Sequence, residues 1–92
     1  MGLWAEADII CQHPRVVNVK DIVLKSIKNN YGELDETIVK SFYSKDDGVI
    51  VYFRTTHVGE VFNEILSKII KDLKKENIVF FYVEVKSNHF IT

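Results

Sequence analysis

The segment VGEVFNEILSKIIKDL, residues 58–73, constrains the fold most, because it is amphipathic along its whole length. Its apolar side chains recur at every third or fourth position, which is the period of an α-helix with one buried face. Glu64 and Lys68 occupy the other side at the i, i+4 spacing of a stabilising ion pair. Such a helix needs an apolar surface to cover. The apolar positions are Val58, Val61, Phe62, Ile65, Leu66, Ile69, Ile70 and Leu73.

The remaining apolar segments have the length and composition of strands and of one further helix. Strands are predicted at residues 3–11, 37–44, 49–55 and 78–86, and the pair Asp47-Gly48 predicts a hairpin turn between the second and third. A weaker helix is predicted over residues 19–31. Asn18 is its expected N-cap, with Asp21 in its first turn, and Gly32 stands where a left-handed residue ends a helix.

The order of these elements is β-α-β-β-α-β, which predicts an α+β fold of the ferredoxin-like type. In that fold a four-stranded antiparallel sheet of spatial order 4-1-3-2 has both helices on one face. A chain of 92 residues can bury one core, so we expect residues 1–92 to form a single domain. Its 47% apolar and 27% charged residues are ordinary globular values.

Charge and cysteine content restrict the partners and the compartment. The chain has 12 basic and 13 acidic side chains without a long run of like charge, which argues against nucleic acid and anionic membranes as partners. Cys11 is the single cysteine and has no second cysteine for an internal disulfide, as is typical of a reducing compartment. No segment has the ~20 apolar residues of a membrane span, and the N-terminus lacks the basic start of a secretory signal. We therefore expect a cytoplasmic protein.

The segment IVFFYVEV, residues 78–85, is apolar on both faces of its predicted strand. Successive side chains of a strand point to opposite faces, and the helices cover only one face of the sheet. We assign Val79, Phe81, Val83 and Val85 to the helices. The second strand is ambiguous, because Ile38 and Phe42 compete with Val39 and Tyr43 for the core. The uncovered face is then predicted to carry Trp4, Ile10, Ile50, Tyr52, Arg54, Ile78, Phe80 and Tyr82.

Apolar and aromatic residues in this number on one face are typical of a protein interface. The leading interpretation is a non-enzymatic interaction or regulatory domain that binds a second copy of itself or a partner protein through this face. A C-terminal segment, residues 87–92, that folds across the sheet is the alternative cover. The predicted partner-binding residues are Trp4, Ile10, Ile50, Tyr52, Arg54, Phe80 and Tyr82.

Glu6 and Asp8 lie on the same face, about 7 Å apart along one strand. In a cavity between two facing sheets, two carboxylates could act as acid and base. The second interpretation is therefore a dimeric small-molecule binder or a cofactor-free enzyme, as are some ferredoxin-like monooxygenases and dye- or haem-handling proteins. The simpler expectation is that Glu6 pairs with Arg54 and that Asp8 accepts a hydrogen bond from Tyr52. No catalytic residue is assigned, and no cofactor is predicted.

The loop CQHPRVVN, residues 11–18, precedes a predicted helix, whose first N–H groups favour an anion. His13 and Arg15 are the candidate ligands of a phosphate or carboxylate. The loop resembles in position the phosphate-binding loop of acylphosphatases, which are also ferredoxin-like, but it lacks their glycines. A surface loop with a solvated histidine and arginine is the favoured interpretation.

The histidines do not predict a metal site, because His13 lies at one end of the expected sheet and His57 and His89 at the other. The predicted topology is also that of RNA-recognition domains, whose third strand begins with Lys or Arg, Gly and an aromatic residue. Here Asp47-Gly48 is followed by aliphatic residues and no basic rim is present. Binding of single-stranded RNA on the sheet is therefore the third and least favoured interpretation.

Overall fold

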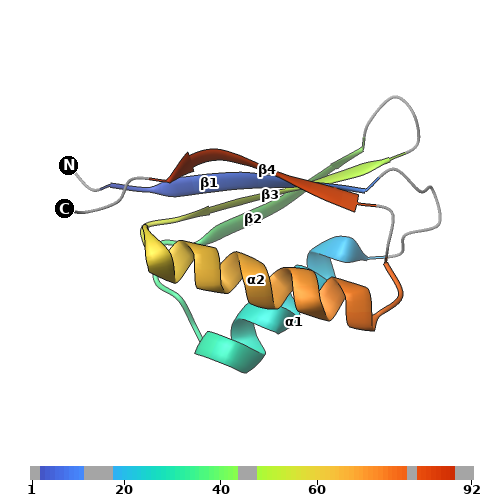
Figure 1. Ribbon diagram of the computed structural model, residues 1–92, viewed down its shortest axis with the longest axis horizontal. Coiled ribbons are helices and arrows are strands. Elements are labelled where there is room, and N and C mark those ends of the chain that lie inside the picture. The colour runs from blue at the N-terminus through green and yellow to red at the C-terminus, as the bar shows by residue number, and fades with distance from the viewer. Residues whose placement is uncertain (1–2, 12–17, 44–47, 79–80, 89–92) are drawn as a thin grey trace.

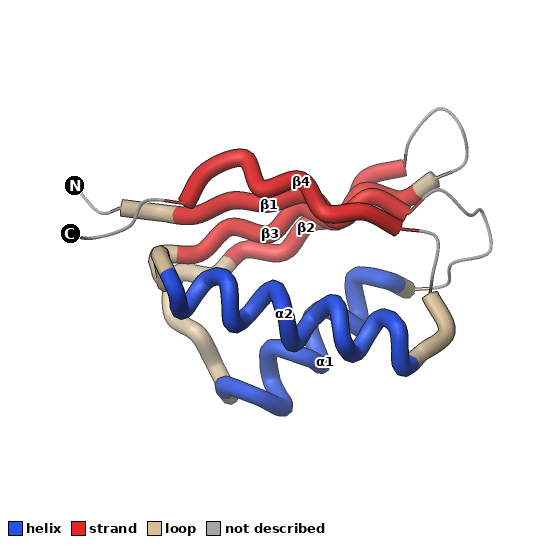
Figure 2. Tube along the Cα trace, viewed as in Figure 1, coloured by secondary structure: helices blue, strands red, loops and turns tan. Residues whose placement is uncertain are grey.

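The computed structural model describes residues 3–11, 18–43, 48–78 and 81–88. Its four strands form one antiparallel sheet of order β2-β3-β1-β4, which confirms the predicted ferredoxin-like α+β fold. Both helices form a second layer against one face of the sheet, and no described segment lies over the other face (Figures 1 and 2). The elements are β1 (Ala5–Cys11), α1 (Val19–Tyr31), β2 (Ile38–Tyr43), β3 (Val49–Thr55), α2 (Glu60–Lys75) and β4 (Phe81–Asn88).

The core lies between the inward face of the sheet and the two helices. Alternate residues of β1 are small or aliphatic and fully buried, and Ala7 is the register partner of Phe53 on β3. The small side chain leaves room for the large one, and the ring of Phe53 stacks on that of Phe62 from α2 with centroids 5.6 Å apart. The largest fully buried side chains include Ile9, Val51, Phe53, Phe62, Ile65, Ile69 and Leu73.

Both helices lie close to their predicted limits, but their N-termini differ from expectation. Asn18 precedes α1 in a left-handed conformation, φ 56°, and its side chain forms no capping bond, so the predicted side-chain cap is wrong. Instead its backbone carbonyl accepts a hydrogen bond from the N–H of Ile22, at 3.1 Å. Gly32 ends α1 at a positive φ of 71°, as predicted, and its N–H bonds to Lys28 O.

Ile78 is in the core and not on the uncovered face, where the alternation of residues 78–85 placed it. Its N–H donates to the carbonyl of Leu73 at 3.0 Å, so it belongs to the turn after α2 and not to β4. Val85 is register-paired with Ala7, and Phe81 with Cys11. Val85 is nevertheless 49% exposed, on the edge strand of the sheet.

A register shift between β1 and β4 changes which way the end of β4 points. Ala7 pairs with Val85 but Glu6 pairs with Ser87, so Lys86 is an extra residue, a β-bulge. Beyond the bulge Asn88 pairs with Ala5, on the helix side of the sheet. The Asn88 amide accepts from the N–H of Gly59 at 2.7 Å and donates to its carbonyl at 3.2 Å. The bulge thus turns the Asn88 side chain to the helix side of the sheet, where it bonds to the backbone at the start of α2.

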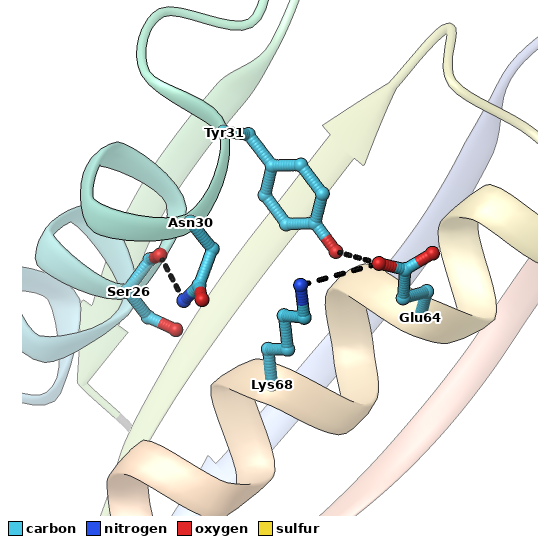
Figure 3. A network of polar contacts seen from close by, with 5 residues as sticks. All are labelled: Ser26, Asn30, Tyr31, Glu64 and Lys68. Carbon is cyan, nitrogen blue, oxygen red and sulfur yellow. Dashed lines mark hydrogen bonds and ion pairs between the residues drawn. The ribbon is translucent and has the colours of Figure 1, made fainter.

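A polar cluster joins the outer surfaces of the two helices (Figure 3). The Tyr31 hydroxyl donates to Glu64 at 3.2 Å, and Lys68 forms the predicted i, i+4 ion pair with the same carboxylate at 3.2 Å. Hydrogen bonds from Lys68 and Tyr31 lower the pKa of Glu64. On α1, Asn30 donates to the carbonyl of Ser26 at 2.8 Å, whereas the buried Ser26 hydroxyl has no partner among the described residues. Neither helix of the described chain is long and apolar enough to cross a membrane.

Candidate interaction face

The strand register identifies the side chains on the sheet face that the helices leave uncovered, which we call the open face. Directly paired residues of antiparallel strands point to the same side, so the buried alternate residues of β1 fix the facing of all four strands. The ambiguity in β2 is thereby resolved, since Val39 pairs with the buried Phe53. The open face carries Glu6, Asp8, Ile10, Ile38, Lys40, Phe42, Ile50, Tyr52, Arg54, Tyr82, Glu84, Lys86 and Ser87.

An apolar row crosses the open face from one edge of the sheet to the other. Phe42 pairs with Ile50, Ile50 with Ile10, and Ile10 with Tyr82, one residue from each strand. The two edge residues are the most open, Phe42 at 52% and Tyr82 at 50% exposed. Four strands about 4.8 Å apart make this row roughly 15 Å long between its outer Cα atoms. We call these four residues the apolar row.

The next row along the strands is polar and carries opposite charges at its two ends. Lys40 pairs with Tyr52, Tyr52 with Asp8, and Asp8 with Glu84. Lys40 on β2 and Glu84 on β4 are both exposed and form no ion pair with another described residue. The polar row therefore has a cation at one edge of the sheet and an anion at the other.

The central charged residues of the open face are bound within the chain. The Tyr52 hydroxyl donates to Glu6, and Lys86 forms an ion pair with Asp8 at 3.1 Å. The expected hydrogen bond from Tyr52 to Asp8 is therefore wrong, although Tyr52 and Asp8 are direct register partners as predicted. Burial, followed by the hydrogen bond to Glu6, raises the pKa of Tyr52, and the hydrogen bond to Asp8 raises that of Lys86. Both carboxylates of the predicted acid–base pair, Glu6 and Asp8, are therefore bonded to other side chains of the same chain.

Trp4 lies just before β1 and extends the open face. The guanidinium carbon of Arg54 is 4.7 Å from the centroid of the Trp4 ring, a cation–π distance. Arg54 is register-paired with Glu6, as predicted, but among the described residues the two side chains form no ion pair, and Ile38 is the register partner of Arg54 on its other side. A surface hollow beside this contact includes neither Glu6 nor Asp8, and it is lined by Leu3, Trp4, Glu36, Ile38, Arg54, Thr55 and Thr56.

The charges of the open face balance. Its described residues include three cations and three carboxylates, namely Lys40, Arg54 and Lys86, and Glu6, Asp8 and Glu84. A surface that binds a nucleic-acid backbone carries an excess of positive charge. The described part of the face has no such excess.

No similar protein indicates a function for this face. No protein-family model, curated protein or solved structure matches the chain. The open face is therefore the feature of the molecule from which a function can be inferred.

Other candidate residues fall outside this surface. Cys11 is fully buried, and burial raises the pKa of its thiol to about 11, so the thiolate that a nucleophile requires is scarce at neutral pH. His57 lies in the turn before α2, where its backbone N–H donates to the hydroxyl oxygen of Thr55 at 3.2 Å. Among the described residues no group of three His, Cys, Asp or Glu side chains could hold a metal ion. His13, Arg15, Phe80 and His89 lie outside the described residues.

The residues that sequence reasoning missed lie on the two edge strands. Phe42, Ile38 and Lys40 were unassigned because β2 has apolar residues in both phases. The hairpin register gives the missing signal, since pairing with β3 puts Phe42 beside Ile50 and leaves Tyr43 on the other side, 88% exposed. Glu84 lies two residues after Tyr82 on β4, and its place at the opposite end of the polar row from Lys40 follows only from the sheet order.

Proposed function

We propose that the chain is a non-enzymatic protein-interaction domain that binds another protein chain through its open face. The observation that carries this proposal is the apolar row, which is contiguous across all four strands and lies opposite both helices. Exposed apolar surface that is continuous in this way favours association, because each Å² removed from water contributes about 25 cal/mol. Tyr82, Tyr52, Trp4 and Arg54 add the residue types that are enriched at interface centres.

The internal contacts of the carboxylates favour binding over catalysis. An acid–base pair needs groups that are available to a substrate, with separated pKa values. Glu6 already accepts a hydrogen bond from Tyr52, and Asp8 is paired with Lys86 and 9% exposed. We therefore assign these groups a structural role, holding the centre of the sheet while its apolar row makes the contact.

Photo-crosslinking in the native cell tests the proposal with a control on the adjacent residue. Phe42 and Tyr43 are neighbours on β2 that point to opposite sides of the sheet, and both are exposed. A photoreactive phenylalanine at position 42 should form a covalent adduct with another protein chain, whereas the same group at position 43 should form little or none. Absence of an adduct from position 42, or equal adducts from both positions, would show the proposal to be wrong.

A further inference from the structure

We propose that the occupant of the open face is a second copy of the same chain, related by a two-fold axis that runs parallel to the strands between β1 and β3. This inference rests on the proposed function and adds the partner and its orientation. It is drawn from the order of charges and apolar residues across the sheet.

The proposed axis sets the outer strands of one copy over the opposite outer strands of the other. Sheets that pack face to face in the aligned class keep their strands within about 30° of each other. A two-fold axis along the strand direction then puts β2 over β4 of the second copy and β3 over its β1, because the order is β2-β3-β1-β4. Each cross-strand row lies over the same row of the second copy.

This superposition matches side chains by type. Phe42 lies over Tyr82 of the second copy, and Ile50 lies over its Ile10, so the apolar row covers itself. In the polar row Lys40 faces Glu84 of the second copy. Symmetry makes every such contact twice, so the dimer contains two identical Lys40–Glu84 pairs at the rim of the interface.

The other aligned two-fold axis, perpendicular to the strands, gives the opposite result. It puts each strand over the same strand of the second copy. An axis through the polar row would therefore set Lys40 of one copy against Lys40 of the other, and Glu84 against Glu84. Like charges that face each other at an interface are unfavourable and suppress that arrangement. Charge therefore disfavours a perpendicular axis through the polar row, and of the two aligned axes the parallel one alone brings Lys40 of one copy over Glu84 of the other.

Charge reversal at these two positions provides a test that a general loss of folding cannot imitate. K40E alone creates two Glu–Glu contacts in its homodimer, and E84K alone creates two Lys–Lys contacts. Mixed together, the variants should form a heterodimer in which both contacts are again between Lys and Glu. We expect each variant alone to raise the dimer dissociation constant roughly 10-fold or more at low salt, and the mixture to recover it.

Native mass spectrometry of the purified chains separates the outcomes. A heterodimer of K40E with E84K that outnumbers both homodimers, together with a dissociation constant for each variant alone that exceeds that of the wild type, supports the inference. Statistical mixing of the variants, in a wild type that does dimerise, would overturn the proposed axis. A wild type that stays a single chain while position 42 forms an adduct with a different protein would overturn the second copy as occupant and leave the proposed function standing. Failure of the proposed function itself is recognised by the absence of any adduct from position 42.

Discussion

The hydroxyl of Tyr52 on β3 donates a hydrogen bond to Glu6 on β1, although the residue directly opposite Tyr52 is Asp8. The bond is therefore diagonal across the two central strands. It leaves Asp8 to pair with Lys86 from the bulge of β4. In this way three neighbouring strands are joined by polar contacts on the open face.

Replacement of Tyr52 by phenylalanine tests the diagonal bond. Y52F should lower the free energy of unfolding by about 1 kcal/mol, because the partly buried Glu6 carboxylate loses its donor. Tyr82→Phe is the matched control, since Tyr82 lies on the same face without a hydrogen bond to another described residue. Urea unfolding of both variants at a concentration where the protein is monomeric gives the comparison. Equal stability losses would show that the diagonal bond contributes nothing.

Removal of the unpaired Ser26 hydroxyl should stabilise the protein. Ser26 is buried within α1 and its Oγ has no partner among the described residues, so the folded state carries the cost of desolvating it. S26A should raise the free energy of unfolding by about 1 to 2 kcal/mol from this relief together with better helix propensity. Ser67→Ala on the exposed surface of α2 should gain about 0.5 kcal/mol from propensity alone. A thermal unfolding midpoint for S26A below that of the wild type would contradict the assignment.

Substitutions of Asn88 should lower stability by different amounts, depending on whether the side-chain oxygen is retained. Asn88→Ala loses both bonds to the Gly59 backbone and should destabilise the protein by about 1 to 2 kcal/mol. Asn88→Asp keeps an oxygen for the Gly59 N–H and brings a negative charge to the start of α2, so it should lose clearly less. Chemical denaturation ranks the three proteins. If the aspartate variant were as unstable as the alanine variant, the contact to α2 would not be the source of the effect.

Because the thiol of Cys11 is buried, the free energy of unfolding should fall in alkaline solution. Burial raises its pKa from 9.0 to about 11, so the folded protein holds the thiol proton more tightly than the unfolded chain does. The resulting stability is complete below pH 9 and is lost as the pH rises from 9 to 11. Cys11→Ala should be less stable overall because of the lost packing, but its stability should fall less steeply over this range. Parallel pH slopes of the two proteins would refute the linkage.

Local sequence patterns were sufficient for most of the fold. The helical periodicity predicts α1 and α2, and the expected strand order predicts the pairing of Glu6 with Arg54. These predictions succeed because each depends on one strong burial signal, either the spacing of an amphipathic helix or the period of a half-buried strand.

The features that sequence could not give depend on contacts between distant segments. Ile78 is as apolar as its neighbours in sequence, and only its bond to Leu73 assigns it to a turn. The bulge at Lys86 shifts the phase of β4 by one residue, so strict alternation would have placed Asn88 on the wrong side. The open face was predicted from its central strands, whereas the edge residues Phe42 and Lys40 required the register of the hairpin.

The mass of the purified protein in solution, measured by light scattering for the wild type, Phe42→Glu and Tyr43→Glu, tests most directly whether the open face binds a second copy of the chain. A charge at position 42 interrupts the apolar row, whereas a charge at position 43 lies on the other side of the same strand. Concentrations from ~1 to ~100 μM span the range in which a dimer of micromolar affinity changes state. We predict the mass of two chains for the wild type and Tyr43→Glu, and of one chain for Phe42→Glu. A single-chain mass for all three proteins, or a dimer that both variants weaken equally, would contradict the account.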